Sequence, residues 1–276
     1  MRDTRGRVAA TAAVVLFSTC SLHALTIPDV QQSSASLSWQ SAYAGATVNV
    51  TGGVVTYAAT PPGKMTGRMV IQDPNFSDWA GIAVKVFGGT LVADVQIGDR
   101  VDLTNVFVDE SSKTYGNTYL LFDPTAYGSS FSIGAGGVAV PPTVVSPAVL
   151  GAGDSSADPA AAEKYEGMLV QVNAVTVGSL DLGSHADNYE LANAGATCWA
   201  SDYLNLDRVG PKYHDLTVTG ASRAAVVGVL EQYAKPSDSY DYYQILTRSS
   251  ADIVPEPSAA ALTSAAAWLL IRRKRK

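Results

Sequence analysis

The sequence predicts an all-β protein made of two tandem five-stranded barrels with a short helix, and three observations lead to this fold class. Short runs rich in Val, Thr, Tyr and Ile recur along the chain and are separated by Gly and Pro. No stretch of the body keeps helical periodicity beyond about three turns. The runs also occur twice in the same order, which two copies of one unit explain more simply than a single sandwich does.

The first copy lies between residues 46 and 133. A strand is predicted wherever an alternating or apolar run stands between Gly, Pro or polar clusters. The expected strands are 47–57, 68–73, 81–87, 95–108 with a turn at Gly98-Asp99, and 118–122. Five short strands is the number found in a small Greek-key barrel, so this copy is expected to close on itself.

A Gly-, Ala- and Pro-rich connector, residues 134–156, separates the copies and is expected to be a surface linker in which 143–145 could pair as an edge strand. A short helix is predicted at 159–166, with Asp158 as N-cap, Pro159 in the first helical position and Gly167 just past its end. In the second copy, residues 157–254, the expected strands are 168–177, 188–191, 197–201, 224–230 and 242–246.

Both copies carry segments that resemble the OB-fold modules found beside secreted bacterial nucleases and phosphatases. In the second copy these are 165–172 (YEGMLVQV), the turn at 220–223 before 226–233 (VVGVLEQY), and 243–253 (YQILTRSSADI). In the first copy, 81–84 (GIAV) and 97–104 (IGDRVDLT) fit the same pattern. The resemblance implies OB-like barrels over about residues 46–254. Its motifs are structural, and no nuclease-sized domain follows residue 254.

The C-terminal segment, residues 255–276, combines three features in a fixed order. Pro255, Glu256 and Pro257 precede an apolar run at 258–271, and the chain ends in the basic cluster Arg272, Arg273, Lys274, Arg275 and Lys276. A spanning helix needs about 20 apolar residues, so this run can insert but is short for a permanent anchor. The segment resembles the PEP-CTERM sorting signal, which implies cleavage by an exosortase near the Pro-Glu-Pro triplet after transient insertion of a transmembrane helix into the inner membrane. An ordinary tail anchor is the alternative.

The N-terminal segment, residues 1–24, has the layout of a signal peptide. It contains Arg2, Arg5 and Arg7, an apolar stretch at 8–17 and a cleavage site ending in Ala24. Both ends therefore predict export. The PEP-CTERM resemblance implies the cell surface or extracellular matrix of a Gram-negative-type bacterium, with the exosortase and the secretion machinery as partners. Residues 25–45 form a lead-in to the first barrel.

Processing at both ends would change the charge of the protein. The full chain has 19 Lys and Arg against 25 Asp and Glu, and loss of residues 1–24 and 255–276 leaves 11 against 23, a net charge of about −12. Such a body repels a phosphate backbone unless its few cations cluster. Lys64, Arg68 and Lys85 are dispersed in the sequence. We therefore do not expect nucleic acid to be a partner.

The sequence contains no recognisable catalytic motif. GxSxG, HExxH, GxxxxGK[ST] and CxxC patterns are all absent from the sequence. His214 and Asp215 are adjacent, and on a strand they would point to opposite faces, which is wrong for a catalytic dyad. We therefore expect that the protein is not an enzyme.

Single residues give equally weak evidence for thiol or metal chemistry. Cys198 is the one cysteine left after signal removal, and it is expected to be a buried or incidental thiol. Asp202, Asn205 and Asp207 offer oxygen ligands of the kind that calcium takes, but carboxylates in solvated loops explain them as well. No cofactor is expected, with calcium as the alternative.

Aromatic residues are the remaining indication of function. OB barrels bind oligonucleotides or oligosaccharides across their second and third strands, partly on aromatic rings. Trp199, Tyr203, Tyr240 and Tyr242 are predicted to bind ligand, and the last two would share a face because they are two residues apart on a strand. The alternative for each ring is that it packs the barrel.

These observations predict an envelope or matrix protein that acts as a non-catalytic binding module, with extracellular polysaccharide as its ligand. Sugar is favoured by the acidic charge together with the aromatic residues. The competing interpretation is an accessory or degenerate relative of a secreted nuclease or phosphatase, which binds nucleic acid or assists hydrolysis.

Overall fold

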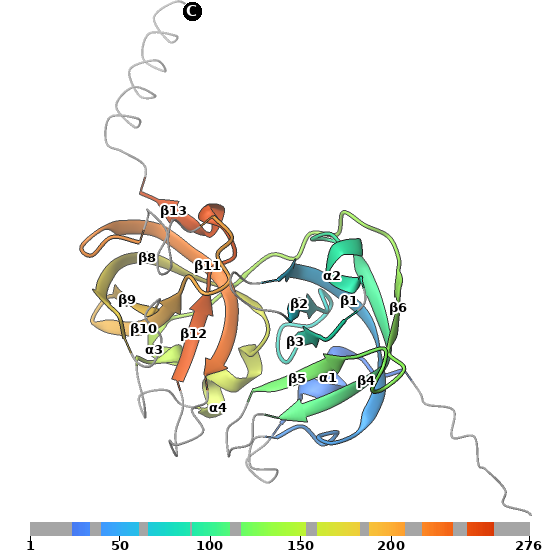
Figure 1. Ribbon diagram of the computed structural model, residues 1–276. Coiled ribbons are helices and arrows are strands. Elements are labelled where there is room, and N and C mark those ends of the chain that lie inside the picture. The colour runs from blue at the N-terminus through green and yellow to red at the C-terminus, as the bar shows by residue number, and fades with distance from the viewer. Residues whose placement is uncertain are drawn as a thin grey trace, which may run out of the picture.

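In the computed structural model, the chain forms two closed β-barrels that lie side by side (Figure 1). The structure describes residues 24–33, 40–60, 66–88, 90–110, 117–152, 159–182, 188–207, 217–233 and 242–256. The predicted signal peptide up to residue 23, and the predicted sorting segment after Glu256, lie outside these residues. Within the described ranges, we find no helix with the length and apolar character needed to cross a membrane.

The first barrel is formed by β1 (Thr47–Ala59), β2 (Gly67–Gln72), β3 (Gly81–Val86), β4 (Arg100–Glu110) and β5 (Thr118–Phe122). The strands pair in the order β1-β2-β3-β5-β4, and β4 pairs again with β1 to close the barrel. β3 and β5 run parallel, whereas the other barrel pairs are antiparallel. β6 (Ser130–Ile133) adds an edge strand to β4.

The second barrel repeats this topology with β8 (Leu169–Leu180), β9 (Asn188–Asn193), β10 (Ala196–Ser201), β11 (Ser222–Tyr233) and β12 (Tyr242–Leu246). The order is β8-β9-β10-β12-β11, closed by pairing of β11 with β8, and β10 and β12 run parallel. β7 (Thr143–Val144) pairs with β8, and β13 (Ile253–Pro255) pairs with β11. The predicted fold class, two OB-like five-stranded barrels, is confirmed.

Six short helices accompany the strands in the described part of the chain. They are α1 (Ile27–Gln31), α2 (Leu91–Asp94), α3 (Pro147–Leu150), α4 (Pro159–Ala162), and the 3-10 turns η2 (Glu163–Tyr165) and η3 (Ser250–Asp252). The helix predicted at 159–166 is thus α4 continued by η2, and its predicted cap Asp158 lies outside the described residues. The connector is more than a surface linker, because Val145 and Leu150 pack into the core of the second barrel.

Each barrel encloses its own apolar core, because alternate residues of a strand point to the same face. Val50, Met69, Ile82 and Leu103 belong to the core of the first barrel, where α1 adds Ile27 and Val30. Val172, Leu191, Cys198, Tyr243 and Ile245 belong to the core of the second. In β1, register shifts mark irregular pairing between Val50 and Gly53, where Gly52 has a φ of 78°. Such bulges let a long strand bend around a small barrel.

Candidate functional site

The outer face of the first barrel is buried against the second barrel. Tyr57, Val70 and Ala83 project outward from β1, β2 and β3, and none is more than 5% exposed. They pack against Leu204, Val229 and Leu246 of the second barrel. OB barrels bind ligands on the face of their second and third strands. In the first barrel, that face is already occupied by the neighbouring barrel.

Hydrogen bonds and an ion pair cross the same interface. Arg68 Nη2 on β2 lies 2.6 Å from Glu231 Oε1 on β11, with side chains 12% and 14% exposed. The backbone N–H of Leu169 donates to Gln72 Oε1 at 2.8 Å. Because apolar packing and directional bonds act together, the two barrels form one packed unit.

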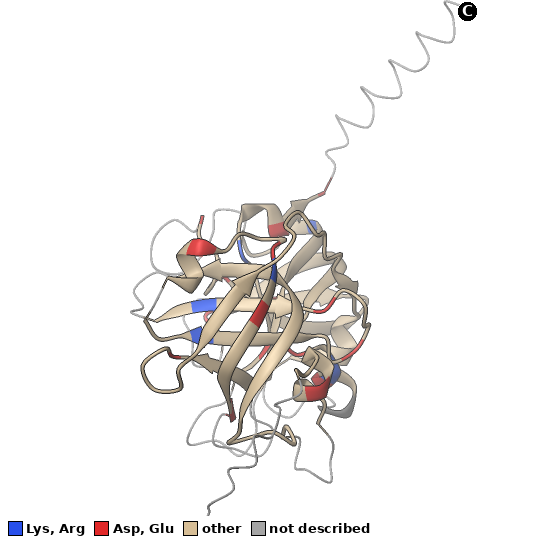
Figure 2. Ribbon diagram, turned by 90° about the vertical axis from the view of Figure 1, so that its right-hand side faces the viewer, with Lys and Arg blue, Asp and Glu red and all other residues tan. Residues whose placement is uncertain are grey.

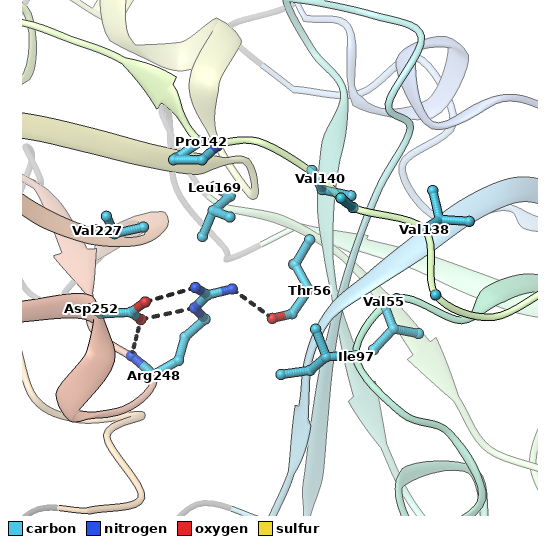
Figure 3. A pocket seen from close by; sticks show the side chains of 13 residues that line it. Val55, Thr56, Ile97, Val138, Val140, Pro142, Leu169, Val227, Arg248 and Asp252 are labelled. Carbon is cyan, nitrogen blue, oxygen red and sulfur yellow. Dashed lines mark hydrogen bonds and ion pairs between the residues drawn. The ribbon is translucent and has the colours of Figure 1, made fainter.

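A cleft of about 490 Å³ opens between the barrels (Figure 3). Arg248 lies in it, where Nε and Nη2 donate to the Asp252 carboxylate at 2.8 and 2.7 Å and Nη1 donates to the carbonyl of Thr56 at 3.0 Å. The apolar part of the lining is Val55, Ile97, Val138, Ala139, Val140, Pro142, Leu169 and Val227. The charge of Arg248 is already paired with that of Asp252. We therefore assign Arg248 to bridging the two barrels.

Three aromatic rings gather on the outer side of β10, β11 and β12, a surface that we call the aromatic face. Trp199 lies between the core residues Cys198 and Ala200, so alternation turns it outward, and the same argument turns Tyr242 outward beside Tyr243. The ring centroids of Trp199 and Tyr242 are 4.4 Å apart at an interplanar angle of 63°. Those of Tyr233 and Tyr242 are 5.3 Å apart. None of the three rings belongs to the apolar cluster between the barrels.

The aromatic residues predicted to bind ligand do not all lie where that role requires. Tyr242 is only 2% exposed, and its hydroxyl accepts a hydrogen bond from Asn188 Nδ2 at 2.9 Å. The expectation that Tyr242 offers an open ring is therefore wrong, because neighbouring side chains cover it. Trp199 is partly exposed, Tyr203 packs beside the cluster between the barrels, and Tyr240 lies outside the described residues.

Tyr233 and Glu190 also lie on this face, although the sequence did not indicate it. Tyr233 is partly exposed and lies directly opposite Tyr242 in the β11–β12 pair. Glu190 on β9 lies directly opposite Trp199, so both side chains stand on the outer face. Only if the predicted strand 224–230 is extended to Tyr233, as in the structure, does an antiparallel pairing with 242–246 bring Tyr233 beside Tyr242.

The three weak calcium candidates are engaged in hydrogen bonds. Asp202 is fully buried and accepts from the hydroxyls of Thr247 at 2.6 Å, Thr217 at 2.7 Å and Tyr189 at 3.3 Å. Asn205 donates to Thr247 Oγ1 at 3.2 Å, and Asp207 accepts from the backbone and side chain of Ser250. Across the described ranges, no group of three or more ligating side chains is placed to hold a metal ion.

Cys198 points into the core of the second barrel and is fully buried, as the sequence predicted. Burial, with a smaller effect of the Glu190 carboxylate, raises the pKa of its thiol to about 12. A thiol with so high a pKa stays protonated at neutral pH and is a poor nucleophile.

Comparisons with known proteins give distant likenesses to solved structures alone. No protein-family model and no curated protein matches this chain. Among solved structures, the OB domain of MM0293 from Methanosarcina mazei is similar, with a TM-score of 0.28 and 12% identity over 36% of this chain and 83% of that chain. Pot1pC of Schizosaccharomyces pombe bound to single-stranded DNA gives 0.27 and 11%, over 33% and 79%. A murine DNA-binding protein bound with double-stranded DNA gives 0.32 and 10%, over 72% and 92%.

These findings correct one expectation drawn from the sequence. We did not expect nucleic acid as a partner, yet two of these neighbours are structures of DNA complexes. Arg68 and Lys85 are dispersed in the sequence but are direct cross-strand neighbours on β2 and β3, where Arg68 is paired with Glu231. Figure 2 shows Lys and Arg at a few places on the described ribbon, interspersed with Asp and Glu. Charge alone therefore does not decide between classes of ligand.

Proposed function

We propose that the protein is an exported, non-catalytic binding protein that holds carbohydrate on the aromatic face of its second barrel. One observation carries the proposal: Trp199 and Tyr233 are partly exposed around the buried ring of Tyr242. In the first barrel the outer face of β1, β2 and β3 is covered by the second barrel, whereas Trp199 and Tyr233 of the second barrel keep part of their surface open.

The chemistry of the aromatic face supports a sugar ligand. Tryptophan and tyrosine present a flat apolar surface with a polar edge, which suits the C–H face of a sugar ring. Glu190 stands beside Trp199, and a carboxylate accepts hydrogen bonds from hydroxyl groups such as those of sugars. Asn188 donates a hydrogen bond to the hydroxyl of Tyr242 and so fixes the position of the buried Tyr242 ring. The rings are thus held in position before a ligand binds.

Export is supported by the two ends of the sequence. Residues 1–24 have the layout of a signal peptide, and residues 255–276 resemble an exosortase-processed sorting signal. Pro255 is the last residue of β13, and Glu256 after it is exposed. Cleavage near Pro255–Pro257 would therefore leave both barrels whole.

The test is a glycan-array and calorimetric binding measurement on residues 25–256, with single-stranded DNA as a second ligand class. Trp199→Ala and Tyr233→Ala should each weaken glycan binding at least tenfold, which is about 1.4 kcal/mol. Phe76→Ala removes an aromatic ring that is 46% exposed outside the aromatic face, and it should leave binding unchanged. Unchanged glycan affinity in folded Trp199 and Tyr233 variants would contradict the proposal. Binding of DNA alone would favour the nucleic-acid interpretation.

A further inference from the structure

Three glutamates lie together where the two barrels meet, and two of them are fully buried while Glu110 is partly buried. Glu110 is at the end of β4 in the first barrel, whereas Glu163 and Glu166 lie in and just after η2, directly before the second barrel. Glu163 and Glu166 are each 1% exposed. Carboxylates almost never lose this much solvent unless something offsets their charge.

Hydrogen bonds tie these carboxyl groups to both barrels. Glu166 Oε1 accepts from Gln31 Nε2 at 2.8 Å and from the backbone N–H of Thr118 on β5 at 3.0 Å. Glu163 Oε2 accepts from the hydroxyl of Tyr243 on β12 at 2.5 Å. The segment that precedes the second barrel is thus held to α1 and β5 on one side and to β12 on the other.

Glu110 completes the group from the side of the first barrel. Its Oε1 accepts from Thr118 Oγ1 at 2.8 Å and from the backbone N–H of Ser41 at 2.9 Å. Thr118 therefore contacts two of the three glutamates, through its hydroxyl and through its backbone N–H. We call Glu110, Glu163 and Glu166 the carboxyl cluster.

The carboxyl cluster has more acceptors than donors. Glu110 Oε2, Glu166 Oε2 and Gln31 Oε1 are buried, and no described residue donates a hydrogen bond to them. A buried acceptor left in this state costs about 1–3 kcal/mol. A protonated carboxyl group supplies the missing O–H donor, whereas an ionised one cannot. A bound cation would also balance the charge of such a site. Among the described residues, however, no group of three or more ligating side chains is placed to hold a metal ion.

The raised pKa values of the three glutamates also favour protonated carboxyl groups. Burial raises the pKa of Glu110 to about 7 and that of Glu163 to about 7. Burial, followed by the charges of Glu163 and Glu110, holds the pKa of Glu166 well above its usual range. The other titratable groups that act on the cluster are Asp109, whose charge raises the pKa of Glu110, and the phenol of Tyr243, whose hydrogen bond lowers that of Glu163. Hydrogen bonds from Ser41, Gln31 and Thr118 also lower these pKa values, and the nearby hydroxyl of Ser33 lowers that of Glu163.

We propose that the carboxyl cluster is a proton-operated latch between the two barrels. With its protons bound, the cluster is neutral, and its hydrogen bonds hold the segment before the second barrel against the first barrel. When the protons leave, like charges face one another in a buried seam, and the contact loosens. Protons therefore serve as the ligand that closes the pair of barrels.

The direction with pH follows from linkage. The pKa values of these glutamates are higher in the folded chain than the value of about 4.3 in an unfolded chain, so the folded chain binds more protons between these limits. Their contribution to stability is fully present below about pH 4.3 and is lost as the pH rises through about 7. The latch is closed in acid and opens toward neutral and alkaline pH.

The test follows the melting temperature and hydrogen exchange of residues 25–256 between pH 5 and pH 8. The wild type should lose about 5 °C or more across this range. Glu163→Gln and Glu166→Gln, which mimic the protonated groups, should each flatten that loss, and with Glu110→Gln they should remove most of it. Asp94→Asn removes one charge at an exposed position and should follow the wild type.

Exchange of the Thr118 amide separates a latch from a general effect on stability. After correction for the intrinsic rate, its protection should fall at least tenfold from pH 5 to pH 8 in the wild type and by much less in Glu166→Gln. If protection at Thr118 does not change with pH, or if the melting temperature of the wild type changes with pH no more than that of the variants, the latch is wrong. The single variants keep the test valid should the triple variant fail to fold.

Discussion

At the scale of single residues, Asp202 shows that buried acidic side chains in this protein serve the fold. Three hydroxyl groups converge on its carboxylate, from β9, from the segment before β11 and from the residue after β12. A buried donor that loses its acceptor costs about 1–3 kcal/mol, and without Asp202 these three hydroxyl groups would lose theirs together. Asp202 therefore ties three segments of the second barrel to one point.

Replacing Asp202 with Ala should lower the free energy of unfolding by about 3 kcal/mol, because buried hydroxyl donors lose their acceptor. Asp207→Ala, at an exposed position of the same segment, should cost less than about 1 kcal/mol. Urea unfolding measures both. Because the Asp202 carboxylate already accepts three hydrogen bonds from hydroxyl groups, addition of EDTA should change the stability of neither the wild type nor the variants. A fall in stability on chelation would show that the calcium interpretation of this segment was right.

At this scale the sequence could predict which side of the barrel a side chain faces, but not how much of that side chain is exposed to solvent. The alternation of β10 and β12 is local, so it places Trp199 and Tyr242 on the outer side of the barrel without any structure. Whether an outward ring is open depends on what covers it, and Tyr242 is covered by Trp199 and Tyr233 from neighbouring strands. Tertiary neighbours of this kind leave no mark in the sequence around Tyr242 itself.

At the scale of elements, the five strands of each barrel could be predicted because their patterns are local and bounded by Gly or Pro. α2, β6 and β13 were missed because elements of three or four residues are too short to show a period.

The sequences of β2 and β3 also indicate that both faces of these strands are buried. Their runs at 69–71 and 82–84 are apolar without alternation, which is typical of strands buried on both faces. That pattern predicts a covered outer face, as the structure shows.

The junction between η2 and β8 depends on two glycines that touch through their backbones. A Cβ atom added to Gly167 would lie 2.6 Å from the carbonyl carbon of Gly81, and one added to Gly81 would lie 2.1 Å from that of Gly167. Gly167 also has a φ of +70°, which other residues adopt only with strain. The first barrel and the start of the second can approach this closely only because both positions lack a side chain.

Gly167→Ala should therefore destabilise the protein by about 3 kcal/mol or more, since backbone strain and a backbone clash act together. Gly195→Ala is a matched control, because Gly195 has a φ of +84° but nothing within 4 Å of an added Cβ. It should cost only about 1–2 kcal/mol, from the left-handed backbone alone. Chemical denaturation gives both values. Equal losses at the two positions would mean that the close approach of the barrels adds nothing.

At the scale of the whole molecule, the two barrels are joined by apolar packing, the Arg68–Glu231 ion pair and the Arg248 bridge. β13 pairs with β11 at the end of the described chain, so the described residues end beside the second barrel (Figure 1). We expect protein recovered from its native cell surface to lack residues 258–276, as an exosortase substrate would. Intact-mass measurement decides this, and a mass that includes Arg272–Lys276 would contradict processing.

The covered face of the first barrel has a consequence for the order in which the chain folds. Chains are synthesised from the N-terminus, so the first barrel can close once β5 has emerged. Val229 and Leu246, which cover its outer face, follow only about a hundred residues later. During that interval Tyr57, Val70 and Ala83 face solvent as an apolar patch on a finished barrel, and such patches are sites of aggregation. The partly synthesised chain is therefore prone to aggregation. Binding of a chaperone, or rapid synthesis of the second barrel, would then determine how much of the protein folds correctly.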